Sequence, residues 1–317
     1  MTTSRDAREL GQFIPLHYHY NMLQETARMQ GFKDALQYAV PPDAKVLELG
    51  GGTGVLSFFA AQKASKVYCV ERNPELVATA KRLLALNANG HKVEVIQADA
   101  FDYLPPEPVD VVICEMIHVA MLREKQIPVI SQFKERYLKK FGGKLPVFVP
   151  EACIQAVQPV QQSFVFEDYY APVILFQNPI ATQPSTVELA DPAMYQLFSY
   201  DGALSDLIQW HGAITIQHDG ELNALRFITK NILAIVVGEQ RTIDWHSQYL
   251  VVPLPAPMAV RAGEVIEVAF SYGAGAGFDA LTDSLHVSLR SDETTTGNWF
   301  GEQVSAEPRV EFRATAV

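Results

Sequence analysis

The chain has 317 residues, of which 48% are hydrophobic and 19% are charged, and its formal net charge is −11. This length suits roughly two domains with substantial cores. Because an acidic surface repels the phosphates of nucleic acids, we expect no nucleic-acid partner.

Two further features of the composition narrow the class of protein. No stretch approaches about 18 consecutive apolar residues, so we expect no membrane span. The N-terminus lacks the apolar segment of a signal peptide, and the three cysteines have neither metal-ligand nor disulfide spacing. We therefore expect a cytoplasmic protein without a metal site.

Before residue 150, short β-branched runs alternate with segments whose apolar residues recur at helical spacing. The runs that predict strands lie at 44–50, 65–71, 92–99, 109–115 and 144–150. The segments that predict helices lie at 20–40, 56–64, 74–89 and 123–140. Strands that alternate with helices favour a parallel, doubly wound sheet. We expect an N-terminal helical cap over 1–30 and a Rossmann-like α/β domain over 31–150.

After residue 150 the pattern changes to short alternating segments separated by Gly, Pro and Asp. The segments lie at 152–160, 211–217, 224–229, 232–238, 248–255 and 263–272. Such spacing predicts an antiparallel β-barrel-like or sandwich domain, which we place at 151–317. The mixed stretch 180–210 is a candidate helical insertion.

The first predicted strand runs into a glycine-rich turn in "VLELGGGTGVLSFFAA". Glycines let the backbone approach a ligand closely, and the following helix start supplies N–H donors. The dinucleotide pattern G-x-G-x-x-G fails here, because Val55 occupies the third glycine position. The pattern E-x-G-x-G-x-G fits throughout, with Glu48, Gly50, Gly52 and Gly54, and it resembles motif I of class I methyltransferases that use S-adenosylmethionine (SAM).

Two acids follow the next two predicted strands. Glu71 closes the second strand, where a carboxylate can accept hydrogen bonds from both ribose hydroxyls of a nucleoside cofactor. Asp99 follows the third strand, at the position where the methyltransferases that the chain resembles hold the adenine amino group. The alternative reading for either acid is a helix cap or a turn residue.

The stretch "VVICEMIHVAMLRE" places Glu115 and Glu124 nine positions apart, at the two ends of an apolar loop. Two converging carboxylates suit a guanidinium, which is planar, always charged and rich in N–H donors. "CEMIHVAMLRE" resembles the double-glutamate loop of protein arginine methyltransferases, and "HYNMLQETAR" resembles the helix that precedes their glycine motif. The resemblance is close over 15–150 and loose over 151–290.

This resemblance implies roles for several residues. Glu115 would bind and polarise the guanidine, and Glu124 would complete the clamp. Arg28 would pair with the carboxylate of the cofactor. Met22 would pack beside the sulfonium and the substrate, and His19 is a second candidate on the same helix.

A third motif of the family resembles "TIDWHSQYLVVP" in the predicted β domain. Trp245 keeps the family's tryptophan, and we expect it to face the substrate cleft. Asp244 replaces the family's histidine and adds a negative charge, which favours a more cationic or differently shaped substrate, or else caps a turn. The family's dimerisation arm has only 180–210 as a counterpart, so a homodimer is kept as an option.

We therefore predict a SAM-dependent N-methyltransferase that acts on a guanidino nitrogen of a protein or of a small molecule. A first alternative is a class I methyltransferase for another nitrogen or oxygen nucleophile, with a glutamate as general base. A second is a methyltransferase-like binding module without catalysis. A nicotinamide-dependent oxidoreductase is the remaining alternative.

Overall fold

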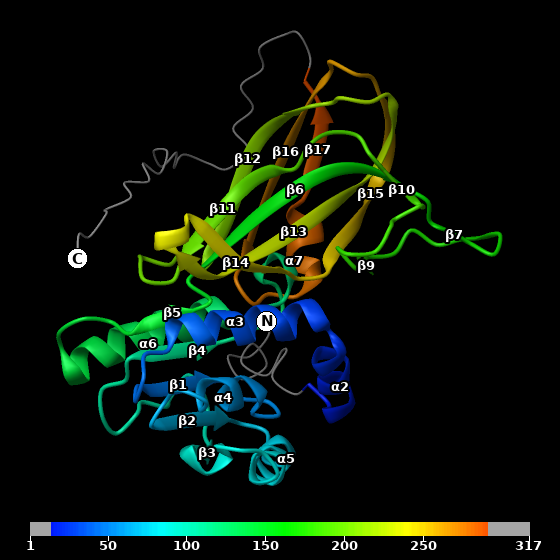
Figure 1. The fold of residues 1–317 in the computed structure, drawn as a ribbon. Helices are drawn as coiled ribbons and strands as arrows, with labels where there is room; N and C mark the ends of the chain where they lie inside the picture. The colour runs from blue at the N-terminus through cyan, green and yellow to red at the C-terminus, as the bar shows by residue number, and fades with distance from the viewer. Residues whose placement is uncertain (1–13, 291–317) are drawn as a thin grey trace.

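The computed structural model describes residues 14–290 and contains an α/β domain below a β domain (Figure 1). Five parallel strands form one sheet in the order β3-β2-β1-β4-β5. Their bounds are β1 Lys45–Leu49, β2 Lys66–Glu71, β3 Val93–Gln97, β4 Val111–Cys114 and β5 Val147–Val149. Strands β1, β2 and β4 are almost wholly buried, as expected for a parallel sheet covered on both faces.

Helices pack around this sheet where the apolar periodicity predicts them, except for the most N-terminal one, which packs against the next helix and has no buried residue. Their bounds are α2 Leu16–Gln24, α3 Thr26–Ala39, α4 Val55–Ala60, α5 Pro74–Ala85 and α6 Gln126–Phe141. The side chain of Asn73 caps α5 by accepting a hydrogen bond from the Glu75 amide at 2.9 Å, with Pro74 in the first turn. Helix α3 packs against α4 and also against β13 and β14, so it connects the two domains.

The β domain consists of two larger antiparallel sheets and a small hairpin, β7–β8. A seven-stranded sheet has the order β10-β6-β13-β15-β9, with β11 paired to β6 and β14 to β13. A three-stranded sheet has the order β12-β16-β17. The bounds are β6 Ala152–Gln162, β7 Val165–Phe166, β8 Tyr169–Tyr170, β9 Leu175–Gln177, β10 Thr186–Glu188, β11 Ala193–Ser199, β12 Leu207–Thr215, β13 Gly220–Val236, β14 Arg241–His246, β15 Tyr249–Val260, β16 Val265–Gly273, α7 Phe278–Ser284 and β17 His286–Leu289.

The two sheets pack through aromatic side chains. The ring of Phe270 on β16 lies 5.0 Å from that of Tyr195 and 5.5 Å from that of Phe227. Within residues 14–290 the strand pairing does not close into a ring, so the domain is two facing sheets rather than a closed barrel. The predicted fold class, a Rossmann-like domain followed by an antiparallel β domain, is confirmed.

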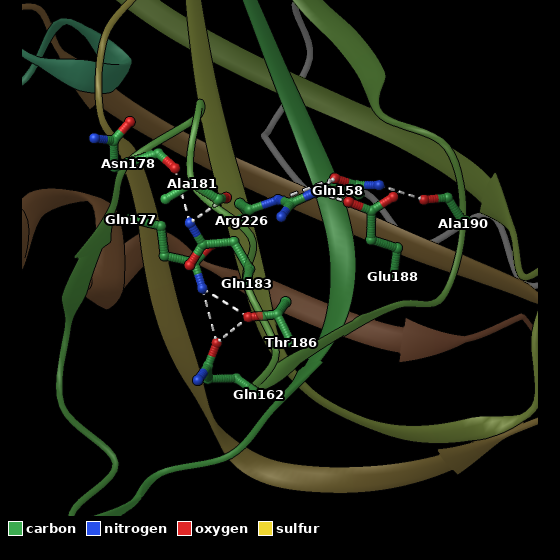
Figure 2. Close-up of polar contacts among 10 residues, drawn as sticks. All are labelled: Gln158, Gln162, Gln177, Asn178, Ala181, Gln183, Thr186, Glu188, Ala190 and Arg226. Carbon is green, nitrogen blue, oxygen red and sulfur yellow. Dashed lines mark hydrogen bonds and ion pairs between the residues drawn. The ribbon is translucent and has the colours of Figure 1, made fainter.

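Polar side chains inside the β domain form hydrogen bonds with one another (Figure 2). Arg226 is only 5% exposed; its Nε donates to Gln158 Oε1 at 3.1 Å, and its guanidinium also pairs with Glu188. Gln177 donates to Gln162 Oε1 at 3.0 Å and to Thr186 Oγ1 at 2.7 Å. Because buried polar groups are costly without partners, these contacts fix how β6, β9, β10 and β13 meet.

Three features of the β domain differ from the sequence prediction. The stretch 180–210 contains strands β10 and β11 and no helix, so the candidate helical insertion is wrong. The segments 224–229 and 232–238 fall largely within one long strand, β13, rather than in two. The short helix α7 was not predicted. Within the part of the chain that the structure describes, no helix is both long and apolar enough to span a bilayer.

Candidate active site

One pocket lies at the carboxyl ends of β1, β2 and β4, where open α/β sheets bind their ligands. The glycine turn, the end of β2 and the loop after β4 form its floor and sides. Helices α2 and α3 contribute one wall, and the β domain contributes another through Phe176, Trp245, Ser247 and Gln248. Residues from both domains thus border a single cavity.

The glycine turn adopts the left-handed conformation at three positions, with φ of +79° at Gly50, +52° at Gly52 and +80° at Gly54. A side chain disfavours this conformation, so the turn requires glycine there. A Cβ atom at Gly52 would lie 2.8 Å from His19 Cε1. The turn therefore forms a backbone cradle whose space a larger residue would fill.

Replacing Gly52 by alanine should weaken SAM binding by about tenfold or more, because the Cβ atom strains the turn and pushes on His19. Isothermal calorimetry with SAM measures the effect. Gly142→Ala is the matched control, since Gly142 has φ of +65° but nothing within 4 Å of the added Cβ. An equal loss of affinity in both variants would contradict a specific role for the turn.

Glu48 is 2% exposed, and its carboxylate accepts hydrogen bonds from the Ser57 amide, at 2.9 Å, and from the Ser57 hydroxyl. Burial raises the pKa of Glu48 to about 7, against the effect of these hydrogen bonds. Glu48 lines the pocket, and its Oε2 atom accepts both hydrogen bonds and fastens β1 to α4. A direct contact between Glu48 and the cofactor stays a prediction.

Glu71 and Asp99 also line the pocket, at the ends of neighbouring strands. Glu71 accepts hydrogen bonds from the amides of Gly52 and Asn73, both at 2.8 Å, which fixes its carboxylate against the glycine turn. Asp99 accepts one from the Phe101 amide at 3.0 Å and lies 3.5 Å from a guanidinium nitrogen of Arg72. Both acids thus accept hydrogen bonds within turns, which agrees with the alternative that they are turn residues. Both also border the cavity.

Arg28 and Glu115 form an ion pair whose side chains are 7% and 9% exposed. Glu115 directly follows β4, and Arg28 lies on α3, 87 positions away in sequence. The guanidinium carbon of Arg28 also lies 5.5 Å from the ring centre of Phe32 and 5.8 Å from that of Trp245. The structure therefore places the predicted cofactor ligand and the predicted substrate ligand in contact.

Glu124 borders the same pocket, and the two glutamates of the double-glutamate loop (residues 115–124) lie close enough to interact electrostatically. Burial and the negative charge of Glu115 raise the pKa of Glu124 to about 8, while Arg28 and Arg123 act in the opposite direction. The glutamate pair therefore attracts a proton or a cation at neutral pH.

His19 and Met22, on α2, both line the pocket. Burial, assisted by the charge of Arg28, lowers the pKa of His19, so its imidazole is neutral at neutral pH. The Nε2 atom of His19 is buried without a hydrogen-bond partner among the described residues. His19 thus offers an unused polar atom within the wall of the pocket.

Trp245 and Asp244, adjacent on β14, differ in their placement. Trp245 lines the pocket and donates its indole N–H to Glu25 at 2.6 Å. Asp244 pairs with Lys230 of the neighbouring strand at 2.5 Å and is not among the described residues that line the cavity. The structure brings Trp245 to the other candidates but not Asp244, whose role in substrate binding stays a prediction.

The sequence analysis missed two residues of this site. Gln126 is 1% exposed; it donates to the Cys114 carbonyl at 2.6 Å and accepts from the Met116 amide at 2.9 Å, so it fastens the start of the double-glutamate loop. His118 lines the pocket and packs against the rings of Phe176 and Phe278, and burial lowers its pKa to about 4. A glutamine at a helix start gives no sequence signal; the histidine's signal was its place inside an apolar loop.

Comparison with known proteins supports this description. Residues 46–142 match a family described as a methyltransferase domain. Together with the parallel sheet and its glycine turn, this match shows a methyltransferase domain and supports SAM as its cofactor. The chain is also similar in sequence to protein arginine methyltransferases.

The similar proteins match different shares of this chain. An uncharacterised protein of Methanothermobacter thermautotrophicus is 29% identical over 84% of this chain and 97% of that protein. Protein arginine N-methyltransferase 6 of Xenopus laevis is 29% identical over 46% of this chain and 43% of the frog protein. The chain thus spans less than half the length of that enzyme.

Two solved structures share the fold across both domains. The Trypanosoma brucei PRMT1 enzyme–prozyme complex with AdoHcy superposes with a TM-score of 0.69 at 17% identity, covering 88% of this chain and 95% of that one. Protein arginine methyltransferase 10 of Arabidopsis thaliana gives a TM-score of 0.66 at 18% identity, covering 82% and 88%. At these identities the likeness establishes the fold alone.

Proposed function

We propose that this protein transfers a methyl group from SAM to a guanidino nitrogen, in an arginine-containing protein or in a small guanidino compound. The observation that carries the proposal is the meeting of Glu115 and Glu124 in a pocket that the glycine turn also borders. The acidic lining favours a cation, and a guanidinium stays charged at any physiological pH.

The residues that would hold SAM fit its chemistry. The glycine turn offers a close-fitting backbone cradle, Glu71 presents a carboxylate at the end of β2 for the ribose, and Arg28 supplies a cation for the carboxylate. Asp99 borders the same end of the cavity. When bound, SAM supplies an electrophilic methyl group on a sulfonium.

The two glutamates would act by orientation and by charge. Each carboxylate can accept charge-assisted N–H bonds from the guanidinium and hold one nitrogen in line with the methyl donor, an effect worth up to ~7–11 kcal/mol in ideal cases. Their negative charge also stabilises the positive charge that moves onto the guanidine. Ile117 and Val119 are buried and line the pocket, so they would keep water from this end of it.

A second candidate is methyl transfer to another nitrogen or oxygen nucleophile. The observation that favours it is the pKa of Glu124, about 8, which suits a general base at neutral pH. In that case Glu124 would remove a proton from a neutral nucleophile rather than bind a cation. Met22 and His19 would then border the nucleophile in the same way.

Relatives support both kinds of guanidino substrate. An arginine N(omega)-methyltransferase of Streptomyces achromogenes is 30% identical over 41% of this chain and 37% of that enzyme. The Xenopus and Arabidopsis relatives are named as protein arginine methyltransferases. The choice between a protein and a small molecule therefore requires an experiment.

We expect methyl-labelled SAM to place label on a guanidine nitrogen. The protein would be incubated with arginine-rich peptides, with free arginine and guanidino metabolites, and with a cell extract, and the products analysed by mass spectrometry. Label on a guanidine nitrogen supports the proposal and identifies the substrate pool. Label on another atom favours the second candidate, and no label in any pool, with SAM bound, favours the binding module.

We also propose that the protein forms a homodimer and is located in the cytoplasm. The Trypanosoma relative is described as a heterotetrameric complex. In this chain the hairpin β7–β8 projects from the β domain (Figure 1) and exposes Phe166, Tyr169 and Tyr170, between 49% and 72% each. Exposed apolar side chains gathered on one projection are typical of protein–protein contacts.

A further inference from the structure

The loop between the two glutamates has an unusual backbone. Ala120, Met121 and Arg123 adopt positive φ of +57°, +53° and +62°, although none is glycine. A Cβ atom disfavours this left-handed conformation, so three such residues within four positions persist only where their surroundings hold them. Ala120 is fully buried, which excludes water as the partner of its backbone groups.

Two side chains of the β domain hold Ala120. The Ala120 amide donates to Thr229 Oγ1 at 2.8 Å, and the Ala120 carbonyl accepts from the Tyr272 hydroxyl at 2.9 Å. Thr229 lies on β13 of the seven-stranded sheet, and Tyr272 lies on β16 of the three-stranded sheet. One residue of the loop is thus fixed from both sheets at once.

These two side chains belong to a closed buried network. Thr229 donates its hydroxyl to Gln155 Oε1 at 2.7 Å, which leaves its oxygen to accept from Ala120. Tyr272 donates to Ala120, so the neighbouring hydroxyl of Tyr195, 3.2 Å away, is left to donate to Tyr272. All four side chains are at most 7% exposed. The Tyr195 hydroxyl also lies 3.4 Å from Gln155 Oε1, so the four side chains form one connected network around Ala120.

The β domain also fastens the rest of the loop. The Gly275 amide donates to the Met121 carbonyl, and the Arg123 amide donates to the Ala276 carbonyl, both at 2.7 Å. Glu124 follows Arg123 directly, whereas Glu115 directly follows β4 of the other domain. Gln126 ties the end of the loop to Cys114 and Met116, and the β domain holds the segment between, so both contacts set the separation of the two carboxylates.

We propose that Thr229 and Tyr272 are positioning residues that place Glu124 opposite Glu115. This inference rests on the proposed function of the glutamate pair and assigns part of the active-site geometry to the β domain. Neither side chain lines the pocket among the described residues, so both act through the loop rather than on a ligand. A shift of about 1 Å in a catalytic group can cost about 10²-fold in rate.

Replacing Thr229 by valine tests the inference, because valine keeps the shape and removes the acceptor of the Ala120 amide. We expect kcat to fall by roughly 10- to 100-fold while the Kd for SAM changes by less than about twofold. Thr229→Ser keeps the hydroxyl and should restore most of kcat. Tyr272→Phe, which removes the donor to the Ala120 carbonyl, should repeat the loss.

Thr186→Val is the matched control, since Thr186 is also a hydrogen-bonded threonine of the β domain (Figure 2) but lies on β10 and makes its side-chain hydrogen bonds with Gln162 and Gln177. It should leave kcat unchanged. Equal losses in Thr186→Val and Thr229→Val, or a Thr229→Val protein with wild-type kcat, would overturn the inference. A parallel loss of SAM affinity would also overturn it, because that pattern indicates general damage to the fold.

Hydrogen exchange gives a readout that does not depend on the identity of the substrate. Peptides that cover residues 116–124 should lose protection in Thr229→Val and keep it in Thr229→Ser and Thr186→Val. Unchanged protection would refute the inference even if the protein methylates guanidines. Lost protection in a protein that labels no guanidine would instead refute the proposed function and leave the loop anchor in place.

Discussion

Replacing Glu115 by glutamine should lower kcat for guanidine methylation by about 10²- to 10³-fold and leave the affinity for SAM nearly unchanged. Glutamine keeps the shape of the side chain but loses the charge that would hold and polarise the guanidinium. In the structure that charge is paired with Arg28. Because the substitution frees Arg28 rather than removing it, the partner for the cofactor's carboxylate is retained.

Steady-state kinetics with a labelled methyl donor, together with calorimetric titration of SAM, separate the two effects. Glu107→Gln is a suitable control, since Glu107 also pairs with a cation, Lys45, but at the exposed end of the sheet. Glu107→Gln should leave both kcat and the affinity for SAM unchanged. Equal losses of kcat and SAM affinity in Glu115→Gln would assign Glu115 to the cofactor instead of the guanidine.

The elements of the α/β domain could be predicted because their signals are local. Continuous apolar runs predict buried parallel strands, and the spacing of Ile127, Ile130, Phe133 and Tyr137 predicts the buried face of α6. The glycine turn was predictable for the same reason, since its left-handed positions lie within five residues. These predictions need no knowledge of what the segments contact.

Long strands with polar interruptions were not predictable in the same way. Lys230 and Asn231 interrupt the apolar pattern of β13, so the sequence predicts two short segments. In the structure Asn231 is fully buried, and it accepts from Cys153 at 3.2 Å and donates to Ser247 at 3.2 Å. A polar residue that finds partners on neighbouring strands continues a strand that its own sequence would end.

The candidate site was also predictable only where its signals are local. Residue types and spacing indicate Glu115 and Glu124, but the pairing of Arg28 with Glu115 joins residues 87 positions apart. The anchor of Ala120 joins it to side chains 109 and 152 positions away. Asp244 illustrates the converse case, because its side chain forms an ion pair with Lys230 of the neighbouring strand, a contact that its own sequence position does not indicate.

Under the proposed function, we expect guanidine binding to depend on pH through Glu124. Burial and the charge of Glu115 raise its pKa to about 8, so below that pH the carboxyl is mostly protonated. A guanidinium binds the ionised form, so binding must release this proton. We expect kcat/KM to rise by up to about tenfold per pH unit from pH 6 to 8 and to level off above.

Glu124→Gln should lower kcat by about 10²-fold and remove this slope, because the neutral side chain has no proton to release. A wild-type profile that is flat from pH 6 to 8, or a slope that persists in Glu124→Gln, would contradict this assignment. Glu48, with a pKa of about 7, also titrates in this range. The effect of Glu124 is therefore the difference between the pH profile of the wild type and that of Glu124→Gln.

Stability should show the opposite pH dependence to binding. An ordinary glutamate has a pKa near 4.5, so between that pH and about 8 the folded state binds a proton at Glu124 that the unfolded chain has lost. The free energy of unfolding therefore decreases as pH rises through this window. The Tm of the wild type should fall more between pH 5 and pH 8 than the Tm of Glu124→Gln. A bound guanidinium should reduce the fall in the wild type, because it supplies a positive charge beside the ionised Glu124.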